Sequence, residues 1–543
     1  MAASEKGEDL KIIFLFFLKI LKTLKAAAEK GINYIESSRL LPSRVWRFEG
    51  ATSSFSVLKR YEFYPVYADI LALVVLALQV WFFAPAGGGG RGEPAVLISM
   101  AGYIAASYAV FAVAMRHIMG DDISSEPSLY ILAVFLLLVN NFVFLISEVY
   151  GIQYLFLSSG IVFMAALLMP PALSVVFAVL VQIILLPFYT PVGGSIAVLF
   201  PALLMSSAMA ALIFVVSPPI SSRVAIISYG IKISAVNTAI FAFTRELFGG
   251  NFAGVEIYYA LVSGLVASAF VLIFLPIVEL IFKRLSPVSL VELSDINKPL
   301  MKQMMLSAPG TYHHSLITAS LAEAAADAIG ASGALARVGA YYHDIGKLFK
   351  PEYFIENQIY SGNPHDEVTP TMSGMVLMAH VKEGVELARR YRLNPRIIDF
   401  IEEHHGTSLI IQFYHKAIIK DINVKEKDFR YDGLRPRTRE TAVVMLADSV
   451  EAASRTLSAL KPSAISDMVK KVVNNKFVDG QLNDSPLTLR DIEIITDTMI
   501  RTLCGILHVR YQKQSAEESS DGMVKSFQSG ASDKVSEDKE SAT

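Results

Sequence analysis

The sequence predicts an all-α protein, in which a polytopic helical membrane domain is followed by a water-soluble helical domain. Of its 543 residues, 53% are hydrophobic and only 18% are charged. The apolar residues are concentrated in the first half of the chain, up to about residue 284. From residue 285 onward charged residues return, and stretches such as 315–330 show the 3.6-residue period of amphipathic helices. This split is typical of a membrane protein that carries a soluble module.

Residues 1–62 are predicted to form a cytoplasmic segment with an amphipathic helix. The stretch 11–30 places five lysines among large apolar residues, and its uninterrupted apolar run, 12–18, is too short to cross a bilayer. We expect it to lie on the anionic inner surface of the membrane. The alternative is a first span whose lysines extend toward the headgroups. No cleavable signal peptide is evident, because the apolar run lacks a small-residue cleavage site.

Residues 63–284 are predicted to form seven or eight membrane-spanning helices. Prolines in the stretches 167–174 and 186–194 mark breaks between apolar segments. Basic residues such as Arg60 and Lys283 flank the apolar region, which places both of its ends in the cytoplasm and favours eight spans. We therefore expect a multi-pass protein of the cell membrane. The candidate spans lie near 66–86, 95–115, 129–149, 153–170, 172–188, 191–216, 224–246 and 258–282.

Residues 285–512 are predicted to form the soluble helical domain. Within it, Gly330 is expected to end one helix, and Pro395, after Asn394, to begin another. Residues 513–543 are rich in Ser, Lys and acidic residues, and are predicted to be a disordered tail.

Two bulk properties exclude classes of function. The single cysteine, Cys504, excludes an intramolecular disulfide and fits a reducing compartment. The formal net charge of −2 gives no electrostatic argument for a nucleic acid polymer as partner.

The histidines are concentrated in the predicted soluble domain. Seven of the ten lie between residues 313 and 405, and one of these, His343, precedes Asp344. A lone histidine in an apolar helix is usually a packed core residue, but seven in one helical module favour a metal site. Imidazole and carboxylate suit Mn, Fe and Zn, and without a nearby cysteine a structural thiolate zinc site is disfavoured. The seven are His313, His314, His343, His365, His380, His404 and His405.

Five predicted helices or helix ends each carry part of one set: His314, His343–Asp344, His380, His404–His405 and Asp448. A helical bundle can direct side chains from several helices to one interior point. Asp344 could bridge two cations through its two carboxylate oxygens, with histidines completing each shell. Two metals about 3.5–4 Å apart can hold a phosphodiester and lower the pKa of a shared water toward neutrality. Asp448 would be a costly buried acid unless it too were paired or bound to metal. The pattern predicts hydrolysis of a phosphate ester by a metal-activated water.

The motif HDIGK at 343–347, preceded by GTYHHS and followed by HHGT, resembles the HD superfamily of metal-dependent phosphohydrolases. A wider set resembles the seven-transmembrane HD phosphodiesterases of the PgpH type, over about residues 66–512. That set is ELSDINKPLMKQMMLSAPGTYHHS, FIENQ, NPHDEVTPTMS, HVKEGVELA, EEHHGTSLIIQFYHKA and TAVVMLADSVEAASR. Members of this family hydrolyse cyclic di-AMP. The resemblance therefore implies this substrate and the product pApA. It also implies a cytoplasmic HD domain that binds two divalent metal ions, Mn or Fe.

The resemblance also implies site residues. Asp344 would bridge the metals, and His314 would be preferred to His313 because it directly precedes SLITAS. The implied ligands are His314, His343, Asp344, His380, His404, His405 and Asp448. The family's large extracytoplasmic domain is replaced here by the stretch 85–94, so sensing through it is not expected. The Gly-Tyr-Pro motif of cyclic di-GMP hydrolases is absent, which points away from that substrate.

Other residues near these motifs are candidates for catalysis or substrate contact. Lys347 lies one helical turn after His343 and could neutralise a phosphate oxygen; the alternative is a solvated lysine. Candidate nucleotide contacts are Tyr312, Asn357, Gln358 and His365. The last three could equally cap local turns, since Asn363–Pro364 is a turn signal.

The sequence leaves several functions open. The leading hypothesis is a membrane-anchored cyclic di-AMP phosphodiesterase whose partners are this nucleotide and the lipid bilayer, with a homodimer as a further option. An HD hydrolase of another nucleotide, such as (p)ppGpp, is the second hypothesis, because metal ligands alone do not select the substrate. A catalytically silent membrane receptor is disfavoured because every ligand position is filled. A transporter is disfavoured by the lack of intramembrane acids.

Overall fold

The computed structural model describes most of the chain from residue 94 to residue 508. The described residues are 68–70, 72–74, 76, 94–119, 127–149, 152, 155, 157–185, 196–216, 220–248, 254–358, 362–457 and 461–508. Within these ranges the elements are helices, and the one strand-like pairing is an isolated bridge between Leu409 and Arg430. The predicted all-α fold is confirmed. The predicted N-terminal amphipathic helix, the loop 85–94 except Pro94, and the predicted tail lie outside the described residues.

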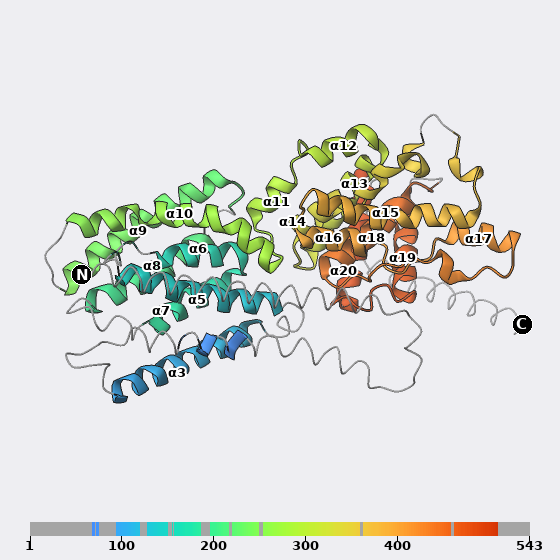
Figure 1. Cartoon of the computed structure of the whole chain (residues 1–543). Coiled ribbons are helices and arrows are strands. Elements are labelled where there is room, and N and C mark those ends of the chain that lie inside the picture. The colour runs from blue at the N-terminus through green and yellow to red at the C-terminus, as the bar shows by residue number, and fades with distance from the viewer. Residues whose placement is uncertain are drawn as a thin grey trace, which may run out of the picture. The chain divides into compact units, whose positions relative to one another are not determined.

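Within the described residues, apolar helices occupy seven of the predicted spans (Figure 1). Helix α9 packs between α8 and α10, and α7 contacts both α3 and α8. The predicted break in 167–174 is confirmed: α6 ends at Leu168, and Pro171 opens α7, where its missing N–H costs nothing. The helices are α3 (Pro94–Met119), α5 (Pro127–Val149), α6 (Ser158–Leu168), α7 (Pro171–Leu185), α8 (Ile196–Val216), α9 (Arg223–Phe248) and α10 (Gly254–Phe282).

Two helices among the described residues are long and apolar enough to cross a membrane, Arg223–Leu247 and Gly254–Phe282. They approach each other closely at Gly230 and Gly264, where a Cβ on Gly264 would lie 1.9 Å from the Gly230 carbonyl oxygen. Small residues at such crossings let two helix backbones touch. Shorter apolar helices are Ser128–Phe144, Ser158–Leu168, Pro171–Leu185 and Pro201–Phe214.

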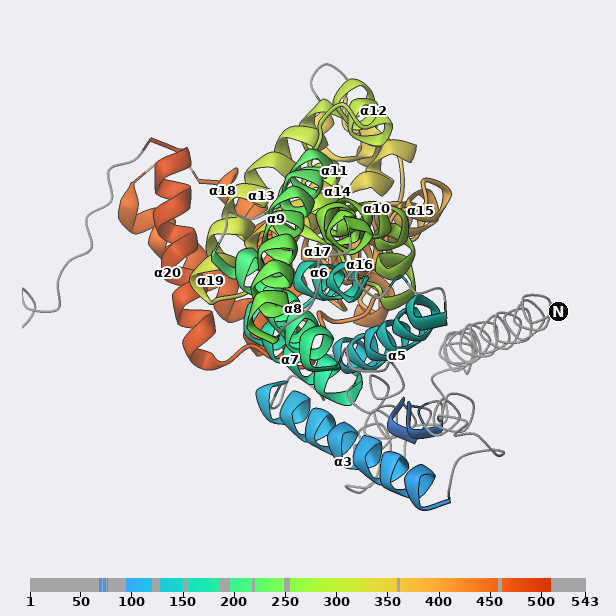
Figure 2. The same ribbon diagram turned by 90° about the vertical axis from the view of Figure 1, so that its left-hand side faces the viewer.

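The C-terminal part is a bundle of helices (Figures 1 and 2). Gly330, at φ 69°, ends α13, and the Asn394 side chain accepts a hydrogen bond from Arg396 N at 2.9 Å to cap α16; both predicted boundaries are confirmed. The helices are α11 (Pro287–Leu293), α12 (Pro299–Ser307), α13 (Pro309–Ala328), α14 (Gly333–Tyr342), α15 (Pro370–Arg390), α16 (Pro395–Glu403), α17 (Ile411–Lys420), α18 (Arg439–Ser454), α19 (Pro462–Val478) and α20 (Leu489–Ile506).

Helix α18 is the centre of this bundle. Residues 441–448 are all buried, and α13, α14, α16, α19 and α20 are its neighbours. A helix that is buried on every side needs apolar residues all round, and six of these eight positions are Ala, Val, Met or Leu. Asp448 lies at the end of this stretch, so its carboxylate is held inside the bundle.

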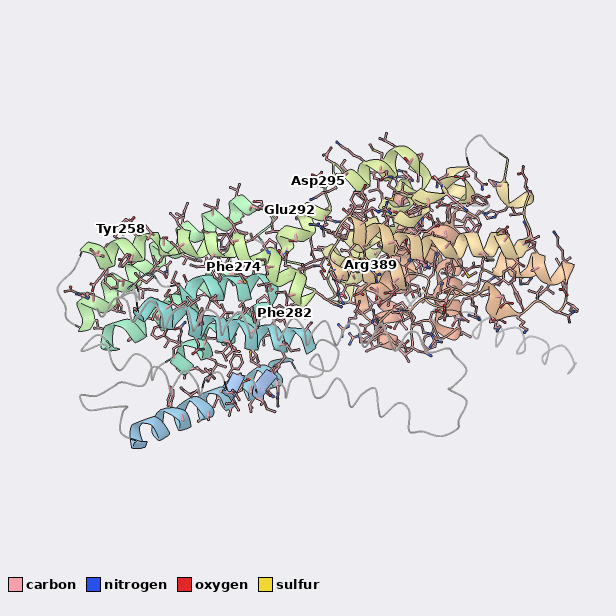
Figure 3. The ribbon with its side chains drawn as sticks, in the orientation of Figure 1. Tyr258, Phe274, Phe282, Glu292, Asp295 and Arg389 are labelled. Carbon is pink, nitrogen blue, oxygen red and sulfur yellow. The ribbon has the colours of Figure 1, made fainter. Side chains whose placement is uncertain are left out.

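The short helix α11 follows α10 directly. Figure 3 marks Phe274 and Phe282 on α10 and Glu292 on α11. The Glu279 carboxylate near the end of α10 accepts hydrogen bonds from Ser286 N at 2.6 Å and Ser289 Oγ at 2.7 Å, which fixes the start of α11. The Tyr342 hydroxyl then donates to the Leu293 carbonyl at 2.9 Å. This bond ties α11 to the end of α14, next to His343.

Candidate metal centre

The seven residues implied as metal ligands come from five helices or helix ends and lie together. They form two groups that share Asp344, and within each group one ligand atom per residue lies within 4.8 Å of the others. One group is Asp344, His380, His404 and His405; the other is His314, His343, Asp344 and Asp448. Exposed His313 lies one residue from buried His314, so the structure brings His314 into the cluster and leaves His313 outside.

A glycine lets two backbone segments pack closely at the centre of the cluster. His343 and Asp344 end α14, and a short 3₁₀ turn, Ile345–Phe349, follows. A Cβ on Gly346 would lie 1.8 Å from the carbonyl oxygen of His380, so only glycine lets α15 pack this closely against the turn. The contact brings His380 Nε2 to 3.4 Å from Asp344 Oδ1.

Three histidines are oriented by their own helices. The Nδ1 atoms of His343, His380 and His404 each lie within hydrogen-bond distance of the carbonyl oxygen three residues earlier. A carbonyl only accepts, so each Nδ1 carries the proton, and in the neutral ring Nε2 keeps its lone pair. His380 Nε2 and His404 Nε2 are 3.2 Å apart. Two lone pairs at this distance repel unless a proton or a cation lies between them, so these donors fit a metal ion.

His314 is held between two carboxylates of α18. Its Nε2 is 3.0 Å from Asp448 Oδ1, and its Nδ1 contacts the Glu451 carboxylate. Arg455 in turn donates to Glu451 at 2.7 and 2.9 Å. A carboxylate behind a histidine ligand fixes its ring and raises its basicity. Glu451 is not among the residues predicted from the sequence, although it lies one helical turn after Asp448 and faces the same side of α18.

The buried charges of the cluster also fit a cation. Burial alone would raise the pKa of Asp344, but His343 and Lys347 hold it well below its usual value. Burial lowers the pKa of His404 to about 4, which keeps this ring neutral, the form that binds metal. Burial would also lower the pKa of His343, yet Asp344 and Asp448 raise it to about 10. His343 Nε2 and Asp344 Oδ1 are buried without a hydrogen bond, as expected where a ligand is required.

Lys347 belongs to the cluster, and the interpretation as a solvated lysine is wrong. Its side chain is 11% exposed, and its Nζ lies 2.6 Å from Asp344 Oδ2 and 2.9 Å from Glu356 Oε1. The ring of Phe354 lies 5.0 Å from the same Nζ. Glu356, which lies inside the FIENQ motif, is not among the residues predicted from the sequence.

The candidate nucleotide contacts lie outside the two ligand groups. Tyr312 is half-buried and packs on the α11–α12 side of the bundle. Asn357 bonds Thr311 N at 3.1 Å and Thr311 Oγ1 at 2.9 Å. Gln358 donates to the Glu352 carbonyl at 3.0 Å, and His365 Nε2 lies 2.8 Å from the Tyr353 carbonyl. Asn357, Gln358 and His365 thus hold the loop after Lys347 together. Within the described residues, none of the four candidate contacts forms a hydrogen bond with the seven clustered residues.

Comparisons with known proteins agree with this geometry. Residues 311–453 match the family model of the HD domain. Cyclic-di-AMP phosphodiesterase PgpH of Bacillus subtilis is 38% identical over 300 residues, which are 54% of this chain and 42% of the relative. The protein of the same name from Listeria monocytogenes is 44% identical over 254 residues, which are 47% of this chain and 35% of the relative. This chain therefore spans less than half the length of these curated relatives.

A solved structure is also similar. The HD domain of L. monocytogenes PgpH in complex with cyclic-di-AMP is 45% identical, covers 39% of this chain and 100% of the solved chain, and has a TM-score of 0.38. Residues 311–453 of this chain therefore form an HD domain, and the chain is homologous to proteins named cyclic-di-AMP phosphodiesterase PgpH.

Proposed function

We propose that this chain is a membrane-anchored, metal-dependent phosphodiesterase that hydrolyses cyclic di-AMP to pApA. The observation that carries the proposal is the pair of His/Asp groups that share Asp344, inside an HD domain. The names of the homologous proteins support cyclic di-AMP as the substrate.

Two divalent ions, Mn or Fe, are the proposed cofactors. Asp344 would contact both, with His380, His404 and His405 on one side and His314, His343 and Asp448 on the other. When bound, such ions lower the pKa of water and stabilise charge on a phosphodiester. The residues of this chain hold the donors in place: Lys347 keeps Asp344 ionised, and Glu451 orients His314. Lys347 is also the proposed neutraliser of phosphate charge. Tyr312, Asn357, Gln358 and His365 remain proposed nucleotide contacts.

The proposed anchor is the apolar region that contains α9 and α10. Large apolar side chains cover the outer faces of these helices; for example, Val224 is 75% exposed, Ile273 63% and Leu280 60%. Clustered exposed side chains of this kind are costly in water and favourable in lipid. We propose a multi-pass membrane domain of seven or eight spans within residues 63–284, with the HD domain on the cytoplasmic side within residues 285–512.

A direct assay tests the substrate. The full chain, purified in detergent and loaded with Mn or Fe, is given cyclic di-AMP, cyclic di-GMP and ppGpp side by side. We expect turnover of cyclic di-AMP to pApA and much slower turnover of the other two. Turnover of ppGpp alone would overturn cyclic di-AMP as the proposed substrate. Metal-loaded protein that cleaves none of the three nucleotides would favour a catalytically silent receptor.

The substitution Glu451→Gln should weaken metal binding about 10–100-fold, because it removes the charge behind His314 while keeping the side-chain shape. Titration of metal-depleted protein with Mn²⁺ measures the change. Glu323→Gln is the matched control, since Glu323 pairs with Arg337 on the bundle surface at 3.0 Å. Equal Mn²⁺ affinity for Glu451→Gln and the control would contradict the role of Glu451.

A further inference from the structure

Among the seven clustered side chains, His405 is the most exposed to solvent. The His405 side chain is 21% exposed and that of Asp448 is 9% exposed. The other five side chains are at most 5% exposed. We therefore expect a substrate phosphate to approach the cluster past His405. The groups around His405 would then contact the rest of the substrate.

Lys476 of α19 contacts the turn that follows His405. The turn after the histidine pair is closed by a hydrogen bond from Ser408 N to the His405 carbonyl at 3.0 Å. Lys476 Nζ donates to the Ser408 hydroxyl of the same turn at 2.7 Å. The ammonium of Lys476 is thus fixed beside the turn that carries His405.

The charge of Lys476 has no carboxylate partner among the described residues. The acid nearest in sequence is Asp479. Its carboxylate accepts hydrogen bonds from Arg430 at 3.0 and 3.2 Å and from Gln481 at 2.8 Å. Lys476 is half-buried, and burial lowers its pKa although Asp448 and Asp479 oppose this. Lys347, in contrast, has two carboxylate partners. An ammonium that is partly removed from water and bonded to one neutral hydroxyl is unfavourable, and an anionic ligand would offset that cost.

We propose that Lys476 binds the second phosphodiester of the cyclic dinucleotide, the one that is not being cleaved. The inference rests on the proposed function. A cyclic dinucleotide has two phosphodiesters, and with one held at the cluster the other would extend past His405. A lysine suits this position because it acts as a point charge with three donors, of which Ser408 occupies one.

The test compares two substrates with the full chain in detergent, loaded with Mn. For Lys476→Met we expect KM for cyclic di-AMP to rise about 10–100-fold, as for the loss of one hydrogen bond to a charged group. We expect kcat and metal content to stay close to wild type, and Lys476→Arg to recover part of the affinity. Bis(p-nitrophenyl) phosphate has a single phosphodiester, so its KM should be the same for wild type and Lys476→Met.

Two controls separate charge from structure. Lys471→Met removes an exposed lysine of the same helix and should change neither substrate's KM. Ser408→Ala removes the hydrogen bond but keeps the ammonium, so its effect on cyclic di-AMP should be smaller than that of Lys476→Met. An unchanged KM for cyclic di-AMP in Lys476→Met, or an equal loss on both substrates, would overturn the inference. Wild type that cleaves bis(p-nitrophenyl) phosphate but not cyclic di-AMP would instead overturn the proposed function, and the inference with it.

Discussion

The substitution Asp344→Ala should abolish turnover of cyclic di-AMP and remove metal from both ligand groups. Asp344 is the one residue that the groups share. Its Oδ2 lies 3.4 Å from His314 Nε2, and its Oδ1 lies 3.4 Å from His380 Nε2. Without the shared carboxylate neither set of donors is complete, so water is no longer activated and the rate should fall by several orders of magnitude.

The fold should survive Asp344→Ala. Lys347 keeps Glu356 as a partner at 2.9 Å, so no buried cation is left alone. Activity, metal content by elemental analysis and helicity by circular dichroism would be measured on the same preparation. Asp448→Ala is the matched comparison, because Asp448 belongs to one group only and its loss should spare the metal held by His380, His404 and His405. Near-normal turnover by folded Asp344→Ala would refute the shared-ligand role.

The sequence predicts helix ends well where residues at those ends determine them. The ends of α13 and α16 follow from Gly330 and Asn394–Pro395, because left-handed backbone and side-chain capping are properties of those residues. Within the described part of the predicted span 153–170, helix α6 begins at Ser158, after a turn that apolar composition does not reveal. A run of apolar residues shows that a segment avoids water. It does not show where a helix within that segment begins.

The site was predictable where it depends on residue type and less so where it depends on long-range contact. Histidines and acids in separate helices indicated a metal centre, and all seven candidates lie together. Glu451 was missed because its partner, His314, is 137 positions away. Glu356 was missed because it reaches Lys347 from an irregular loop with no period to read. Gln358 instead donates to the Glu352 carbonyl of its own loop, a common use of such side chains, and Asn357 joins that loop to Thr311 of α13.

The substitution Lys347→Met should destabilise the metal-depleted protein by about 3–5 kcal/mol, the usual effect of removing one partner of a buried ion pair. Lys347 neutralises two carboxylates at once, and these are nearly inaccessible: the Asp344 side chain is 1% exposed and that of Glu356 9%. Denaturant unfolding of wild type and variant in detergent, followed by circular dichroism, would measure the loss.

A second change should recover part of that stability. In Lys347→Met/Glu356→Gln one of the two stranded negative charges is gone, while the amide oxygen of the substituted side chain could still accept the bond that Thr311 Oγ1 now gives to Glu356 at 3.1 Å. Added Mn²⁺ should also reduce the difference in unfolding free energy between Lys347→Met and wild type, because a cation at the cluster neutralises the charge of Asp344. If the double variant were no more stable than the single one, the cost would come from lost packing against Phe354 and not from unpaired charge. The two outcomes thus separate the electrostatic role of Lys347 from its steric role.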